Sequence, residues 1–146
     1  MFEPVLTMTD YYDGPRGGIA FYNGTPHLYK SRLINLGSDI DDIFFLMPLA
    51  SKIVELALED WAIWKRWRTA FDQGKATLET HPALPKDRIR HYEISAILQS
   101  ELLINEEKSF CAKAKFKPAD NQKGLLVEWE LVSCEADSDQ GEESSL

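Results

Sequence analysis

A segment near the N-terminus has the composition of an anion-binding loop. Residues 10–18 combine glycines with one arginine and read Asp10-Tyr11-Tyr12-Asp13-Gly14-Pro15-Arg16-Gly17-Gly18. Successive backbone N–H groups in such a segment can form a nest for an anion, and Arg16 would add a bidentate fork for carboxylate or phosphate. The same residues also suit an ordinary turn with a solvated Arg16, because Gly and Pro form turns without a ligand. No Gly-Lys-Ser/Thr follows, so the segment is not a P-loop.

Charged residues fall inside the apolar stripes of two predicted helices. At 100° per residue, Asp60 and Arg68 lie on the aromatic face of the first helix, and Glu93 lies on the apolar face of the second. Charges at core-facing positions need partners. The favoured interpretation is a structural network in which Arg68 pairs with Glu93 across an antiparallel helix pair. Asp60 would then pair with an arginine such as Arg16.

A ligand pocket is the alternative interpretation of the same residues. Trp61 and Trp64 would form its walls and Asp60 would bind a polar group of the ligand. In an enzyme or ligand carrier of this kind, the pocket between helices and sheet would use Asp60, Arg68, His27 or Glu93. A deep cavity with these groups converging in it favours the enzyme, whereas a filled core with an exposed aromatic patch favours an interaction module.

Other chemistries find little support in the sequence. The histidines His27, His81 and His91 match no zinc-binding spacing, and no Gly-x-Ser-x-Gly elbow occurs. Asp87 and His91, four residues apart, are interpreted as a surface pair. Trp64-Lys65-Arg66-Trp67-Arg68 interleaves aromatic and basic residues as single-strand nucleic-acid binders do, but its tryptophans lie on the packed stripe. We therefore expect no metal and no cofactor, and nucleic acid is not a favoured partner.

Three blocks of elements must position these residues. Residues 1–47 read as strands, with Asn23-Gly24 as a type I′ hairpin turn that pairs Ile19 with Leu28. Residues 50–73 form a helix that stops at Gly74, and a second helix starts at Pro85 and runs to about residue 103. The second helix is expected to present one apolar side, made of Ile89, Tyr92, Ala96, Ile97, Leu103 and Ile104.

The third block, residues 110–132, reads as a hairpin. Both of its segments alternate with period two, one with a lysine face and one with a glutamate face. Pairing Lys113 with Glu130 and Lys115 with Glu128 puts Ala114 opposite Trp129. A slip by two also keeps the faces and would put Cys111 opposite Cys134, whereas a slip by one is disfavoured. The whole predicts an α+β fold: an antiparallel sheet of about five to six strands with a two-helix insertion packed on one face.

Composition and charge indicate a globular domain with an acidic end. The chain has 146 residues, 44% of them hydrophobic, and a formal charge of -8. Residues 1–134 are expected to form one domain, and residues 135–146 an acidic, disordered tail. The N-terminus lacks the pattern of a signal peptide and no apolar run could span a membrane, so a cytoplasmic protein with free thiols at Cys111 and Cys134 is expected.

Residues 10–20, 57–64 and 80–85 also carry a resemblance. The first begins Asp10-Tyr11-Tyr12-Asp13-Gly14-Pro15-Arg16, the second contains Glu59-Asp60-Trp61, and the third is Thr80-His81-Pro82-Ala83-Leu84-Pro85. Together they resemble a group of small bacterial proteins with no assigned activity. The resemblance implies a bacterial cytosolic origin and no catalytic residues.

These observations favour a small acidic domain that binds a partner protein or a small ligand without catalysis. The expected contact residues at the N-terminus are Tyr11, Tyr12, Asp13 and Arg16, with the neighbouring hairpin that carries His27. The expected helical contact residues are Asp60, Trp61, Trp64, Arg68 and Glu93. The ligand, the oligomeric state and the strand order are not encoded locally.

Overall fold

The computed structural model describes residues 1–11, 14–32, 35–36, 39–40, 43–120 and 124–134. The chain forms two compact units: a strand-rich unit made of residues 1–49 with 104–146, and a helical unit made of residues 50–103. The α+β class and the antiparallel sheet predicted from the sequence are confirmed. The expected acidic tail at 135–146 lies outside the described residues.

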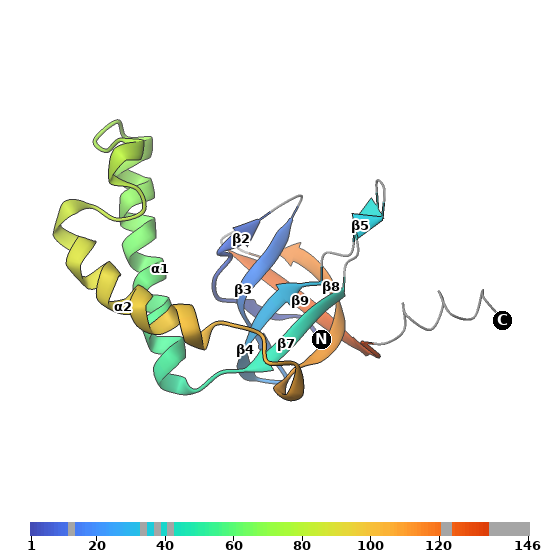
Figure 1. Ribbon diagram of the computed structural model, residues 1–146. Coiled ribbons are helices and arrows are strands. Elements are labelled where there is room, and N and C mark those ends of the chain that lie inside the picture. The colour runs from blue at the N-terminus through green and yellow to red at the C-terminus, as the bar shows by residue number, and fades with distance from the viewer. Residues whose placement is uncertain (12–13, 33–34, 37–38, 41–42, 121–123, 135–146) are drawn as a thin grey trace. The chain divides into compact units, whose positions relative to one another are not determined.

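The strand-rich unit is a closed barrel built from both ends of the chain (Figure 1). Its six strands are hydrogen-bonded in the order β1-β9-β8-β7-β4-β3, and Val5 of β1 pairs with Ala20 of β3 to close the ring. All of these pairings are antiparallel. The strands are β1 (Glu3–Val5), β3 (Pro15–Tyr22), β4 (Thr25–Ser31), β7 (Ile43–Pro48), β8 (Phe110–Pro118) and β9 (Leu125–Val132).

Three short strands complete this unit. β2 (Asp10–Tyr11) pairs with the first residues of β3, and β5 (Asn35–Leu36) pairs with β6 (Asp39–Ile40) in a separate ribbon. The sequence pattern predicted one strand over residues 5–12 and a turn over residues 13–18. Instead β1 and β2 are separate, and β3 already begins at Pro15. Gly17 and Gly18 are strand residues of β3, and neighbouring segments approach both of them closely.

Gly18 shows how close that approach is. A Cβ atom at this position would lie 2.2 Å from the Thr7 carbonyl oxygen. Thr7 is fixed there by three contacts: its Oγ1 accepts a bond from the Ile19 N–H (2.9 Å), its N–H donates to the Ile19 carbonyl (3.0 Å), and its carbonyl accepts the Tyr29 hydroxyl (2.9 Å). The absence of a side chain at Gly18 is therefore what lets the barrel close at this point.

The register predicted for the first hairpin is confirmed, and the second hairpin adopts one of the two registers that the sequence left open. Ile19 pairs with Leu28 across the Asn23–Gly24 turn, and both turn residues have positive φ as a type I′ turn requires. In the second hairpin Lys113 pairs with Glu130 and Lys115 with Glu128. Opposite charges therefore face each other on this surface, and Ala114 lies opposite Trp129.

Aromatic rings fill the barrel. Tyr29 and Phe44 are fully buried, and the rings of Phe116 and Trp129 lie 5.7–6.3 Å from them between centroids. The indole N–H of Trp129 donates to the Phe21 carbonyl at 3.1 Å, which links β9 to β3 across the barrel. Burial raises the pKa of the Tyr29 hydroxyl above its ordinary value, and the nearby Asp10 adds to the effect.

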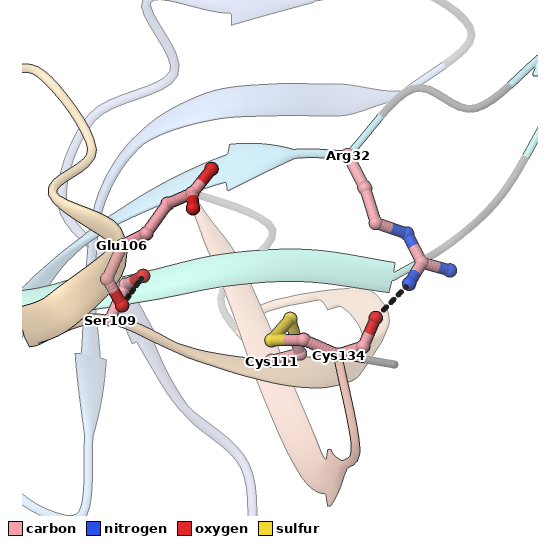
Figure 2. The surroundings of a disulfide bond; sticks show 5 residues. All are labelled: Arg32, Glu106, Ser109, Cys111 and Cys134. Carbon is pink, nitrogen blue, oxygen red and sulfur yellow. Dashed lines mark hydrogen bonds between the residues drawn. A yellow bond between two sulfur atoms is a disulfide. The ribbon is translucent and has the colours of Figure 1, made fainter. Parts of the chain in front are cut away.

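A disulfide joins Cys111 and Cys134, which the sequence analysis expected as free thiols (Figure 2). In the observed register Cys111 pairs with Val132, so Cys134 lies two residues further on, just beyond the end of β9. The chain turns back enough there to bring the two Cα atoms to 5.2 Å. The Arg32 guanidinium donates to the Cys134 carbonyl at 3.3 Å, as Figure 2 shows.

The helical unit contains α1 (Ser51–Asp72) and α2 (Arg88–Glu101). α1 ends in a Schellman motif, in which Gly74 donates to Phe71 and Lys75 donates to Ala70. Gly74 has a φ of 75°, as the sequence pattern predicted for this position. Short 3-10 turns at Leu78–Thr80 and Pro85–Asp87 lead into α2, and Pro85 occupies the first position of its turn. Another 3-10 turn, Glu106–Lys108, precedes β8.

The two helices are antiparallel neighbours, since residues late in α1 contact the start of α2. Packing of this pair on one face of the sheet stays a prediction. Within the described residues, neither helix is long and apolar enough to cross a membrane.

Candidate functional site

Arg16 lies inside the barrel and not on a surface loop. It belongs to β3, only 8% of its surface is exposed, and its guanidinium lies 6.0 Å from the centroid of the Phe44 ring. The expectation of a solvated Arg16 on a loop is therefore wrong, whereas its role as a fork for an anion stays a prediction. The cause is the extension of β3 back to Pro15, which turns alternate side chains inward.

The other predicted N-terminal residues are only partly placed. Tyr11 is 68% exposed on β2, as a contact residue should be, whereas Tyr12 and Asp13 lie outside the described residues. His27 is buried in the barrel wall. Its Nδ1 lies 2.8 Å from the Thr25 carbonyl, and its ring packs edge-on against Tyr22 and Phe110. These contacts make His27 a packing residue.

The helical unit brings Asp60 and His91 together. The Asp60 Oδ1 lies 2.7 Å from Nδ1 of His91, and the Nε2 on the other side of that ring lies 3.4 Å from the Ser95 hydroxyl. Both Asp60 and His91 are largely buried between the helices. The sequence predicted Asp60 as a site residue but paired it with an arginine and interpreted His91 as a partner of Asp87. His91 and Ser95 lie four residues apart on one helix, and this spacing could have indicated that the two side chains contact each other.

Asp60, His91 and Ser95 form a row of contacts, and two arginine ion pairs lie beside it. Arg66 of α1 donates to both carboxylate oxygens of Asp87, at 2.9 and 3.0 Å. Arg90 of α2 donates to both oxygens of Glu59, at 2.6 and 2.8 Å, and also to Glu93. The hydrogen bonds from Arg66 hold the pKa of Asp87 below its ordinary value, and those from Arg90 lower the pKa of Glu59.

The predicted bridge between Arg68 and Glu93 does not form. Arg68 bonds to Asp72 one turn along its own helix, and Glu93 bonds to Arg90 one turn back. All four side chains are about half exposed. Both residues therefore sit on solvated sides of their helices, where a partner within the same helix is the nearest opposite charge.

The tryptophans of α1 form two stacks. Trp61 and Trp64 are parallel, 5.0 Å between centroids, and each is partly exposed. Trp67 is buried, stacks on Phe71, and donates its indole N–H to the Thr80 hydroxyl at 3.0 Å. The ring of His81 meets Trp67 edge-on. Trp67 thus fixes the loop after α1, while Trp61 and Trp64 remain available as contact residues.

α2 buries a different face from the one predicted. Ile94 and Leu98 are its buried residues, whereas Ile89, Tyr92 and Ile97 are 75%, 62% and 45% exposed. Ala96 between them is also exposed. α2 therefore carries two apolar stripes, and the predicted one is not the one that holds the buried residues of this helix. The shorter stripe shares its side of the helix with His91, which contacts Asp60 of α1, and with Ser95, which contacts the His91 ring. We call Ile89, Tyr92, Ala96 and Ile97 the α2 stripe.

Among the residues that the structure describes, no group of three or more His, Cys, Asp or Glu side chains could hold a metal ion. Comparison with known protein families, with curated proteins and with solved structures finds no match to this chain. Function must therefore be argued from the geometry above.

Proposed function

We propose that this protein is a non-catalytic binding domain that receives an amphipathic helix of a partner protein on the α2 stripe. The exposure of Ile89, Tyr92 and Ile97 carries the proposal. Isolated apolar side chains are common on protein surfaces, but a contiguous exposed stripe favours a contact surface.

The filled barrel supports binding on a surface over binding in a cavity. The rings of Tyr29, Phe44, Phe116 and Trp129 pack against one another inside it. Arg68 and Glu93, which a pocket was expected to use, are instead engaged in exposed ion pairs, and His27 is held in the barrel wall. Arg68 and Glu93 therefore give the alternative enzyme interpretation less support, since each already has a partner within its own helix.

The shape and charge of the stripe favour a helix as its occupant. Residues 89, 92, 96 and 97 follow helical spacing over about 12 Å, the length that two turns of a facing helix would cover. Lys86 and Arg88 lie at the N-terminal end of α2 and Glu101 lies at its C-terminal end. A partner helix with acidic residues toward Lys86 and basic residues toward Glu101 would match these charges and the dipole of α2.

Site-specific crosslinking tests the proposal. Tyr92 is replaced by the photoreactive p-benzoyl-phenylalanine in cells that make the protein naturally, and the crosslinked peptide is identified by mass spectrometry. We expect a crosslink to the apolar face of a helix in another protein, and its loss when Ile89→Asp is added. The matched control carries the same photoreactive residue at Lys75, which is exposed in the same unit but away from the stripe.

Three results contradict the proposal. They are equal crosslinking from positions 92 and 75, a crosslink unaffected by Ile89→Asp, and a crosslink to a second copy of this chain. Circular dichroism of Ile89→Asp confirms that the variant is folded; because Ile89 is exposed, we expect its unfolding free energy to change by under about 0.5 kcal/mol.

A second candidate function is acyl transfer by Ser95. It is favoured only by the contact of Ser95 with His91 and of His91 with Asp60. Against it, Ser95 and its neighbours lie inside α2, so their N–H groups are already donated to helix carbonyls and cannot stabilise an oxyanion. Labelling by a fluorophosphonate that is lost in Ser95→Ala would establish it. No labelling would remove it.

We also propose that the protein is bacterial and cytoplasmic and that it does not bind nucleic acid. The cytoplasmic location loses the support of free thiols, because disulfides such as Cys111–Cys134 persist mainly in oxidising compartments. The lysine face of β8 is opposed by Glu128 and Glu130, which argues against phosphate-backbone binding there.

A further inference from the structure

We propose that a groove in the helical unit binds the phosphate group of a small molecule. The groove runs beside the second half of α1 and the turn that precedes α2, and it has a volume of about 520 Å³. It is lined by Ala62, Lys65, Arg66, Thr69, Ala70, Gln73, Leu84 and Lys86. None of these residues belongs to the α2 stripe, although Lys86 also lies at the end of α2 that the acidic residues of the proposed partner helix would face.

Positive charge is concentrated in this groove. Its lining contains three cationic residues, Lys65, Arg66 and Lys86, and no carboxylate. The helical unit as a whole is balanced, with eight Lys and Arg against eight Asp and Glu in residues 50–103. The chain carries a formal charge of -8, so a cationic groove is a local departure from the rest of the molecule.

The cations are held near one another by the helix pair. Arg66 is oriented by its two bonds to Asp87, which use Nε and Nη2 and not Nη1. Because Lys86 precedes Asp87 directly, this bridge also brings Lys86 toward the arginine. In the described part of the chain Lys65 and Lys86 form no ion pair, so their ammonium groups are not already neutralised. Asp87 offsets one of the three positive charges and leaves a net charge that suits a dianion.

The rest of the lining defines the class of ligand. Thr69 and Gln73 offer side-chain donors along α1, and the small or apolar residues Ala62, Ala70 and Leu84 leave a surface for an uncharged part of the ligand. Lysine ammonium groups bind phosphate as point charges without demanding one geometry. The ligand is therefore a phosphate monoester or diphosphate, either free or as a lipid headgroup.

Titration with inorganic pyrophosphate, followed by backbone amide NMR shifts, tests the site. We expect saturable shifts at residues 62–73 and 84–87. Lys65→Gln and Lys86→Gln should each weaken binding about threefold, and the double variant about tenfold, as expected for partly solvated charge contacts. The matched control is Lys52→Gln, an exposed lysine of α1 that is not part of the groove, and it should leave the affinity unchanged.

A second arm distinguishes the source of the phosphate. Co-sedimentation with vesicles containing phosphatidic acid, measured for the wild type and for the double variant, assigns a lipid headgroup if only the wild type sediments. Pyrophosphate binding without sedimentation assigns a free phosphate compound. The proposal is overturned if pyrophosphate gives no saturable shift up to about 10 mM, or if Lys52→Gln weakens binding as much as Lys65→Gln does.

Discussion

His91 and Asp60 meet across the helix pair, with Nδ1 of the imidazole 2.7 Å from the carboxylate Oδ1. A carboxylate only accepts hydrogen bonds, so Nδ1 carries a proton and, in the neutral ring, Nε2 is the acceptor that faces Ser95. The contacts of Asp60, His91 and Ser95 therefore link α1 to α2 and define one tautomer of the neutral His91 ring. These contacts lie on the side of α2 that carries Ile94 and Leu98, and so they help to decide which apolar stripe of that helix is buried.

A double-mutant cycle measures this link. Asp60→Ala and His91→Ala should show a coupling free energy of about 1 kcal/mol in urea unfolding, because both groups are largely shielded from water. The control cycle uses the exposed pair Arg68 and Asp72, for which we expect a coupling below about 0.5 kcal/mol. Equal coupling in the two cycles would show that the shielded pair has no special role.

Gly18→Ala should destabilise the barrel strongly. The added Cβ would lie 2.2 Å from the Thr7 carbonyl oxygen, and Thr7 is held by bonds from Ile19 and Tyr29. We expect a loss of about 3 kcal/mol or more in the free energy of unfolding. Gly24→Ala is the control: its Cβ meets no atom within 4 Å, so only the positive φ opposes it, at about 1–2 kcal/mol. A smaller effect at Gly18 than at Gly24 would contradict the close approach of Thr7.

Removal of the disulfide should also lower stability. The Cys111–Cys134 bond closes a loop with a sequence separation of 23, for which loop-closure entropy predicts a contribution of about 3 kcal/mol. The Cys111→Ala/Cys134→Ala variant should unfold at lower denaturant than the oxidised wild type. In the presence of reductant the two proteins should unfold alike. Titration of two thiols in the unfolded, unreduced wild type would contradict the bond.

The bridge between Arg66 and Asp87 predicts a pH dependence. Its hydrogen bonds lower the pKa of Asp87 in the folded state below the ordinary value of about 3.9 for an unfolded chain. As the pH falls, the unfolded state takes up this proton first. The stabilisation is therefore complete above about pH 4 and is lost as the pH falls through the folded pKa.

Asp87→Asn should accordingly lose less stability than the wild type between pH 5 and pH 2, by up to about 1 kcal/mol, since Arg66 is partly exposed. Urea unfolding at the two pH values measures this difference. Arg66→Gln should behave in the same way because it removes the other half of the bridge. An unchanged acid dependence in both variants would show that the bridge does not stabilise the fold.

Local patterns were enough to predict the two helices, the two hairpins and the register of the first hairpin. The Asn23-Gly24 pair requires positive φ at two adjacent positions, which only a few turns satisfy, so the pairing of Ile19 with Leu28 followed. The alternation of charges limited the second hairpin to two registers, and the structure has the one that pairs Lys113 with Glu130. The end of α1 at Gly74 was predictable because glycine favours that conformation.

The candidate site was much less predictable. Asp60 was identified as a charge that needs a partner, but its partner His91 is 31 residues away. Arg16 lies in a segment that has the composition of a binding loop, yet it belongs to β3 and is buried in the barrel. Periodicity gives the angles between side chains on one helix and does not say which angle faces the neighbour. For this reason the sequence predicted an apolar side of α2 without Ile94 and Leu98, which are its buried residues.

The sequence by itself determined what depends on neighbouring residues: the α+β class, the hairpins and the limits of α1. Only the tertiary structure decided the closure of the barrel through Val5 and Ala20, the disulfide, and which stripe is exposed. The physical reason is that φ preferences, side-chain alternation and charge pairing across a tight turn act over a few residues. Strand closure and helix facing instead depend on the total area buried between segments far apart in the chain.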